Sequence, residues 1–197
     1  MALALPLLAG LVIAPLLGGR WSRLGQVRIR AVPVFFVAIG LQVVAFPFRM
    51  LPWHTPDRVA VVLWLCSYAI LIVGVVANLR LPGVAAIAVG LFLNLSAIVV
   101  NGGHMPALPS ALRGAGLHFV QSRNSASMPA PHLAWFVDRW AAPPWVPLAN
   151  VFSVGDVLIA TGGFVLALAA TGVFRRRRGD AADRPRQYAP RRGPAAF

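Results

Sequence analysis

Apolar residues run along this chain in five long stretches, separated by short polar or arginine-containing segments. A helix needs about 20 apolar residues to cross roughly 30 Å of hydrocarbon, and each stretch approaches that length or character. The pattern therefore predicts an all-α fold, an integral membrane bundle of about five transmembrane helices. The predicted helices cover residues 2–17, 31–48, 59–79, 82–100 and 152–174.

The first stretch is the weakest of the five because it is short and carries Pro6 and Pro15. A secretory signal peptide is the main alternative. No basic segment precedes the stretch, however, and Gly18-Gly19-Arg20 is a poor small-x-small cleavage site. We therefore favour a helix that is retained in the mature protein.

Arginines beside the helices predict the orientation, because the cytoplasmic flanks of membrane spans accumulate positive charge. If the helices alternate, the arginine-rich first loop, Arg80 and the arginines after the last span fall on one side. The pattern predicts a plasma-membrane protein with its N-terminus outside and its C-terminus in the cytoplasm. The long connection before the last helix is then extracytoplasmic. The arginines of the first loop are Arg20, Arg23, Arg28 and Arg30.

Composition supports a membrane protein with one bundle domain. The chain has 197 residues, 58% of them hydrophobic, and its mean hydropathy is +0.73. Its one cysteine, Cys66, lies in an apolar run and excludes both an intrachain disulfide and a thiolate metal cluster. We interpret Cys66 as a packing residue.

The composition changes abruptly after Phe174 and divides the chain into two parts. We predict a transmembrane helical domain over residues 1–174 and a disordered basic cytoplasmic tail over residues 175–197. The arginine cluster that opens the tail could bind anionic lipids or serve only as a stop-transfer anchor. Nucleic-acid binding is not expected, because the charge sits at a bilayer and no aromatic-basic module accompanies it. The cluster comprises Arg175, Arg176, Arg177 and Arg178.

Polar side chains near the ends of the apolar stretches form a candidate site. On the fourth and fifth predicted helices, small and polar residues recur at helical spacing, so each helix has one narrow face of this kind. Such faces let backbones approach and hydrogen-bond across the contact, so we expect the two helices to meet. A purely structural helix contact and a ligand site remain alternatives. The candidate residues are Gln42, Asn94, Asn101, Asn150, Ser153 and Asp156.

Asp156 also has a structural explanation. Ser153-Val-Gly-Asp156 fits the S-x-x-D form of a capping box, in which the two side chains satisfy free amides at a helix start. A carboxylate at a membrane interface is equally what acid–base chemistry on a peptide or lipid requires. Both roles can hold together.

The long connection begins with a turn at Gly102, Gly103 and His104. Its histidines are irregularly spaced and none lies inside a span, so neither a haem nor a metal site is expected. No phosphate-binding or cofactor motif is present, and we expect no cofactor.

Two short interfacial helices are predicted later in the same connection. Pro109 can start the first, and the second covers residues 133–140. In that second helix, Asp138 and Arg139 are expected to form a solvated surface pair.

Two motifs carry a resemblance to a known family. Asn-Gly-Gly-His-Met-Pro at 101–106 and Asn-Val-Phe-Ser-Val-Gly-Asp at 150–156 resemble a multi-pass membrane family, common in actinobacteria, that is known only as a domain of unknown function. The resemblance covers nearly the whole chain up to Phe174. It implies the fold and the location but no activity.

The start of the last helix, residues 150–162, is in part similar to lipoprotein signal peptidase (type II), an aspartyl peptidase of the outer membrane face. This resemblance implies that Asp156 matches one catalytic aspartate and that Asn94 opens the motif on the preceding helix. The second aspartate should then stand at position 97, where this chain has Ala97. Asp138 could replace it only if its loop folds back over the membrane.

The sequence favours a non-enzymatic accessory or binding component with a polar site at the outer membrane face, for a lipid, a hydrophobic ligand or partner helices. One alternative is an aspartyl peptidase-like enzyme, which needs Asp138 and Asp156 to share one proton. A small transporter is a further alternative, although no inverted repeat is visible. The distance between the two carboxyl groups distinguishes the enzyme from the binding protein.

The arginine pattern makes a topological prediction. A cysteine placed near Arg123 should react with a membrane-impermeant reagent in intact cells, whereas one placed near Arg184 should be protected. Reversed labelling would contradict both the orientation and the location of the candidate site.

Overall fold

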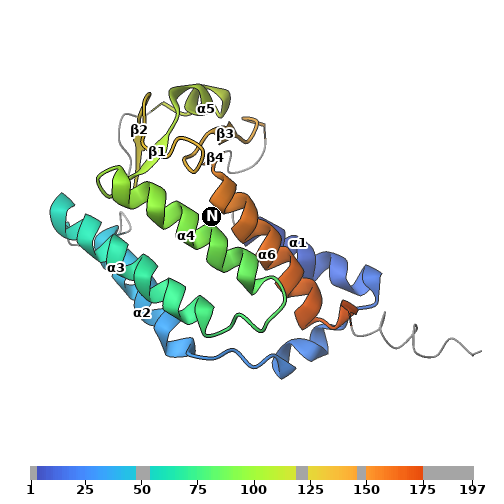
Figure 1. Cartoon of the computed structure of the whole chain (residues 1–197). Coiled ribbons are helices and arrows are strands. Elements are labelled where there is room, and N and C mark those ends of the chain that lie inside the picture. Colours follow the sequence, from blue (N-terminus) through green and yellow to red (C-terminus); the bar gives the residue numbers. More distant parts are fainter. Residues whose placement is uncertain (1–3, 48–53, 119–123, 146–149, 175–197) are drawn as a thin grey trace, which may run out of the picture.

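The computed structural model describes residues 4–47, 54–118, 124–145 and 150–174, and all five apolar stretches form helices in it (Figure 1). Within these residues, α3 is the one helix long and apolar enough to cross a membrane alone, and the other four have 10 to 17 residues. Five full-length spans are therefore not shown. The helices are α1 (Ala4–Ile13), α2 (Val32–Ala45), α3 (Asp57–Val76), α4 (Val84–Val100) and α6 (Val154–Ala170).

Two 3₁₀ segments, η1 (Ala14–Leu17) and η2 (Trp21–Gln26), lie between α1 and α2. The α-helical part of the first stretch ends at Ile13 rather than at residue 17. Pro15 explains this, because proline has no N–H to donate and its ring clashes with the carbonyl four residues earlier.

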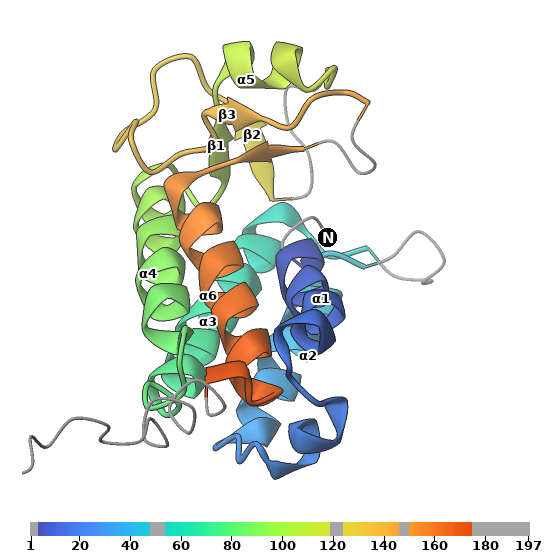
Figure 2. The same cartoon turned by 90° about the vertical axis from the view of Figure 1, so that its right-hand side faces the viewer.

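The residues between α4 and α6 form a cap over one end of the bundle, which we define as residues 101–118, 124–145 and 150–153 (Figures 1 and 2). The cap contains two small sheets, so the all-α prediction is wrong in detail. Strands β1 and β2 form a parallel pair, and strands β3 and β4 form an antiparallel pair. Its elements are β1 (Met105–Ala107), α5 (Pro109–Gly114), β2 (Ser125–Ser127), β3 (Trp140–Ala141) and β4 (Val151–Phe152).

The predicted helix that starts at Pro109 is confirmed as α5, but the one predicted over residues 133–140 is wrong. Leu133 has a φ of 52°, in the left-handed region that a right-handed helix cannot use. Downstream, the Asp138 main chain bonds to the β1 segment and Trp140 pairs with Phe152. Non-local strand pairing therefore overrides the local helical pattern.

Helices α4 and α6 lie side by side (Figure 2). Glycines on their facing surfaces allow the two backbones to come into contact. A Cβ atom at Gly90 would collide with the Gly155 carbonyl oxygen, and one at Gly162 would collide with the Gly83 carbonyl oxygen. A Cβ atom at Gly155 would collide with the Asn94 side chain. Small residues at helix contacts permit such close packing and leave room for polar side chains to bond across it.

The outside of the bundle is strongly apolar. Phe36 on α2 is 70% exposed, Val73 on α3 is 63% exposed and Phe92 on α4 is 62% exposed. An apolar surface of this extent is unfavourable in water and suits an apolar environment.

The end of the bundle opposite the cap is closed by residues 20–30. At one end of this segment, the Arg20 N–H donates to the Thr171 carbonyl at 2.8 Å. At the other, Asn78 donates to the Arg30 carbonyl at 2.9 Å and accepts from the Arg30 N–H at 2.8 Å. The role of Asn78 cannot be recognised in the sequence, because its partner is 48 residues away. Residues 20–30 and the end of α6 therefore lie at the end away from the cap.

The glycine contact makes a prediction about stability. Gly90→Ala should destabilise the protein in detergent by about 1–3 kcal/mol, because the added methyl group overpacks the α4–α6 contact. Gly40→Ala on α2 is the matched control, since a Cβ there meets nothing within 4 Å. Alanine is the better helix former by up to about 1 kcal/mol, so the control should be neutral or stabilising. Equal thermal stability of the two variants would show that the helices are not in backbone contact.

Candidate functional site

The start of α6 is held by the predicted capping box. The Asp156 N–H donates to Ser153 Oγ at 3.0 Å, and the Ser153 N–H donates to Asp156 Oδ2 at 3.0 Å. These two bonds satisfy amides that the helix cannot pair, and the carboxylate meets the positive end of the helix dipole. The capping role of Asp156 is therefore confirmed.

Asn94 of α4 joins this capping box to the neighbouring helix. Its Nδ2 donates to Asp156 Oδ1 at 2.8 Å, and its Oδ1 accepts from Ser153 Oγ at 2.8 Å. Asn94 is only 3% exposed, and Tyr68 of α3 reaches it from a third helix. The predicted contact between the two polar helix faces is present. The Asp156 carboxyl is therefore oriented by two hydrogen bonds, one from Asn94 of α4 and one from the Ser153 N–H at the start of α6.

Asp138 is also part of this cluster, which corrects its predicted place on the surface. It is 6% exposed, and its carboxyl is hydrogen-bonded to that of Asp156. Two carboxyl groups can form such a bond only when one of them carries a proton. No N–H or O–H donor among the described residues reaches Asp138 Oδ1, so the environment disfavours an ionised Asp138.

Burial above all, then the nearby Asp156 charge and the hydrogen bond to Asp156, together raise the pKa of the Asp138 carboxyl from 3.8 to about 8. At neutral pH, Asp138 is therefore the protonated member of the pair. Its predicted partner Arg139 lies elsewhere, with the guanidinium 4.2 Å from the centre of the Trp135 ring.

Main-chain bonds and core packing fix the position of Asp138. Its N–H donates to the Pro106 carbonyl at 2.9 Å, and its own carbonyl accepts from the Leu108 N–H at 2.9 Å. The preceding residue, Val137, is fully buried and packs in a core cluster with Trp64 and Met105. This arrangement brings the loop back over the ends of the helices.

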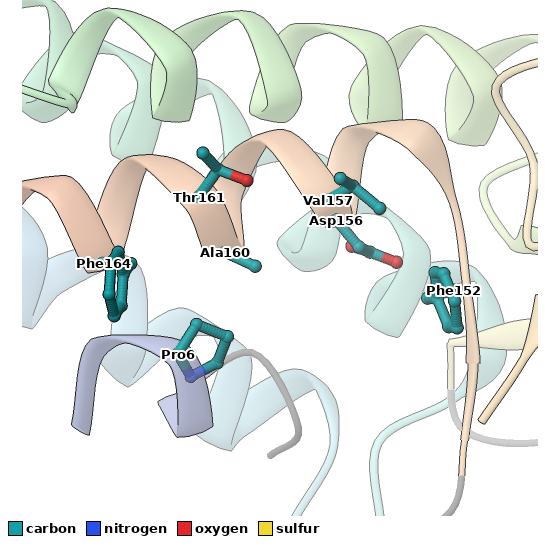
Figure 3. A pocket seen from close by; sticks show the side chains of 7 residues that line it. All are labelled: Pro6, Phe152, Asp156, Val157, Ala160, Thr161 and Phe164. Atoms are coloured by element: carbon teal, nitrogen blue, oxygen red, sulfur yellow. The ribbon is translucent and has the colours of Figure 1, made fainter. Parts of the chain in front are cut away.

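A groove between α1 and α6 reaches Asp156, one member of the carboxyl pair (Figure 3). Its volume is about 410 Å³, and Asp156 is the one ionisable residue among the described residues that line it. Figure 3 shows Asp156 and Phe152 at one end, with Pro6 of α1 facing Phe164 of α6 at the other. An apolar channel that ends at a carboxylate suits a molecule with a hydrocarbon chain and a polar group. The remaining lining residues are Val157, Ala160 and Thr161.

Other predicted site residues lie outside this cluster. Asn101 pins the cap to α4, donating to the His132 carbonyl at 3.0 Å and accepting from the His132 N–H at 2.9 Å. Asn150 is exposed, and its main-chain carbonyl accepts from the Ala142 N–H. Among the described residues, none makes a side-chain hydrogen bond with Gln42.

The predicted turn after α4 is present. Gly102 and Gly103 have φ values of 75° and 88°, which a residue with a side chain adopts only with strain, and His104 follows them. Within the described ranges, no group of three or more His, Cys or acidic side chains could hold a metal ion. The arginine cluster at 175–178 and the predicted tail lie outside the described residues.

Residues 26–168 match the model of a family described as a family of unknown function, DUF5317. The chain belongs to this family. The matched range contains Asn94, Asp138, Ser153 and Asp156. An uncharacterized protein of Thermotoga maritima is 29% identical over 136 residues, which cover 64% of this chain and 72% of that protein. No solved structure matches the chain.

The raised pKa of Asp138 makes a prediction about pH. The carboxyl holds its proton more tightly when folded than when unfolded, so its contribution to stability is complete below pH 4 and is lost as the pH rises towards 8. In this window the free energy of unfolding should fall by up to about 1.4 kcal/mol per pH unit.

Asp138→Asn removes the titrating group and should flatten this pH dependence in thermal unfolding measured in detergent. Asp57→Asn is the control, because Asp57 is exposed in the first turn of α3. A wild-type slope that survives in Asp138→Asn would show that Asp138 is not the group responsible.

Proposed function

We propose that the chain is a multi-pass membrane protein whose five apolar helices cross the bilayer together, with the cap on the outer face. The exposed apolar side chains on α2, α3 and α4 support this placement. So does the segment with Arg20, Arg23, Arg28 and Arg30 at the end opposite the cap, where cytoplasmic positive charge is expected. In this orientation, the N-terminus is outside and the carboxyl pair lies at the outer face.

The function that the geometry supports best is acid–base catalysis by Asp138 and Asp156, in the manner of an aspartyl hydrolase. One observation carries this proposal: a buried carboxyl is hydrogen-bonded to a second carboxyl that lines an apolar groove. A pair of this kind holds one acid and one base side by side at neutral pH. The binding function that the sequence favoured stays as the second candidate.

In hydrolysis of an amide or ester, Asp156 takes a proton from water as the water oxygen attacks the carbonyl carbon. Asp138 donates its proton to the carbonyl oxygen and stabilises the charge that develops there. When the tetrahedral intermediate collapses, the bond to the leaving nitrogen or oxygen breaks. Asp156 then protonates the leaving group, and the hydroxyl proton of the intermediate returns to Asp138.

Asn94 and Ser153 are positioning residues in this scheme. Each donates one hydrogen bond to a different oxygen of Asp156, so together they hold its carboxyl group in place. Among the described residues, donors reach both oxygens of Asp156 but none reaches Asp138 Oδ1, and this difference assigns Asp156 as the base and Asp138 as the acid.

The partial resemblance to lipoprotein signal peptidase (type II) lacked its second aspartate, because Ala97 stands where that residue is expected. Asp138 supplies a second carboxyl from the cap instead, across 18 residues from Asp156 in sequence. The groove between α1 and α6 suits the hydrocarbon part of a membrane-embedded substrate, so the substrate class we propose is a lipid-modified or apolar peptide.

A second candidate function is binding without chemistry, as an accessory component. Two observations favour it: both oxygens of Asp156 already accept hydrogen bonds, and Asp138 is not among the lining residues of the groove. The same groove would then hold an amphipathic lipid whose head group donates to Asp156.

A cleavage assay distinguishes the two functions. The purified chain is reconstituted and incubated with a diacylglyceryl-modified peptide, and products are identified by mass spectrometry. Asp138→Asn and Asp156→Asn should each lower the rate by about a hundredfold or more, the usual contribution of an acid or base. Asp57→Asn, an exposed carboxylate at the same end of the bundle, should leave it unchanged. Bound but uncleaved peptide would favour the accessory function, and cleavage by all three variants would refute the proposed catalytic pair.

A further inference from the structure

A second cavity of about 330 Å³ lies at the end of the bundle away from the cap, between residues 20–30, the α3–α4 turn and the end of α6. Its polar side is formed by Arg23, Gln26 and Arg28. Its apolar side is formed by Leu81, Leu166 and Phe174. Two cationic side chains and several apolar side chains therefore line the same cavity.

The segment that carries these arginines, residues 20–30, is hydrogen-bonded to the helix bundle at both ends. Arg20 is bonded to Thr171 at the end of α6, and Arg30 is bonded to the buried side chain of Asn78 at the end of α3. Between these points, the Arg23 guanidinium lies 3.4 Å from the Gly172 carbonyl oxygen, where a side chain on Gly172 would collide with it. Because the segment is held at both ends, less conformational entropy is lost when Arg23 and Arg28 become ordered around a ligand.

Among the described residues, no acidic side chain lies near these arginines. The described acids are Asp57, Asp138 and Asp156, and they lie at the start of α3, in the cap and at the start of α6, all at the opposite end. An anion is the ligand that compensates two guanidinium groups lining one cavity, and arginine matches the geometry of phosphate oxygens particularly well.

We propose that this cavity binds the phosphate of an anionic phospholipid, with Arg23 and Arg28 on the head group and one acyl chain along Leu166 and Phe174. The apolar lining favours a lipid over a free phosphate, because Phe174 in that lining is 40% exposed and offers apolar surface beside the arginines. The proposal rests on the membrane placement given above but not on the carboxyl pair.

The test measures lipid retention by the full chain after reconstitution in nanodiscs of equal phosphatidylglycerol and phosphatidylcholine. After extraction, native mass spectrometry counts each lipid that remains bound. Wild type should retain phosphatidylglycerol selectively. The double variant Arg23→Gln/Arg28→Gln should bind it about thirtyfold more weakly, the factor expected for two juxtamembrane arginines.

The matched control is Arg58→Gln/Arg113→Gln, which removes the same charge from exposed positions away from the cavity. It should retain the lipid as wild type does. All variants keep the arginines at 175–178, so a difference between them reports on the cavity. Asp138→Asn should also retain the lipid, which separates this site from the proposed catalytic pair.

Three results would overturn the proposal. They are equal retention by the Arg23→Gln/Arg28→Gln variant, equal retention of phosphatidylcholine by wild type, and displacement of the lipid by inorganic phosphate at equal concentration. The last result would mean that the cavity recognises phosphate alone.

Discussion

The close approach of α4 and α6 is the constraint on which the rest of this structure depends. Gly90 and Gly155 remove the side chains that would hold the two backbones apart. Only at that separation can the short side chain of Asn94 reach both Ser153 and Asp156. The capping box, the helix contact and the orientation of the Asp156 carboxyl are therefore one arrangement rather than three separate features.

Asp138 shows how this arrangement serves both structure and chemistry. The cap folds back over the helix ends because Val137 enters the core and the Asp138 main chain bonds to Pro106 and Leu108. The side chain is thereby moved out of water and placed against Asp156, where it keeps a proton at neutral pH. Burying an acid without a donor costs stability, and sites that accept such a cost are frequently functional.

Features that depend on neighbours in sequence could be predicted from the sequence. The five apolar stretches, the capping box at Ser153 and Asp156, the turn at Gly102 and the start of α5 follow from local periodicity and capping chemistry. The contact between Asn94 and Asp156 could also be predicted, because each residue lies on a narrow small-and-polar face of its own helix.

Features that depend on distant partners could not be predicted. Residues 133–140 were expected to be helical, but they form turns and bends that lead to the pairing of Asp138 with β1 and of Trp140 with Phe152. Asn78 and Arg30 are likewise partners through the fold alone. Gln42 was included in the cluster on membrane depth, which says nothing of the direction in which a side chain points.

The central claim is that Asp138 carries a proton at neutral pH while it lies against the charged Asp156. The most direct measurement is the infrared carbonyl band of a protonated carboxylic acid, recorded at neutral pH on the purified protein in detergent. The account predicts that wild type shows this band, that Asp138→Asn abolishes it and that Asp57→Asn leaves it in place. A wild-type spectrum without the band, or a band that persists in Asp138→Asn, would contradict the account.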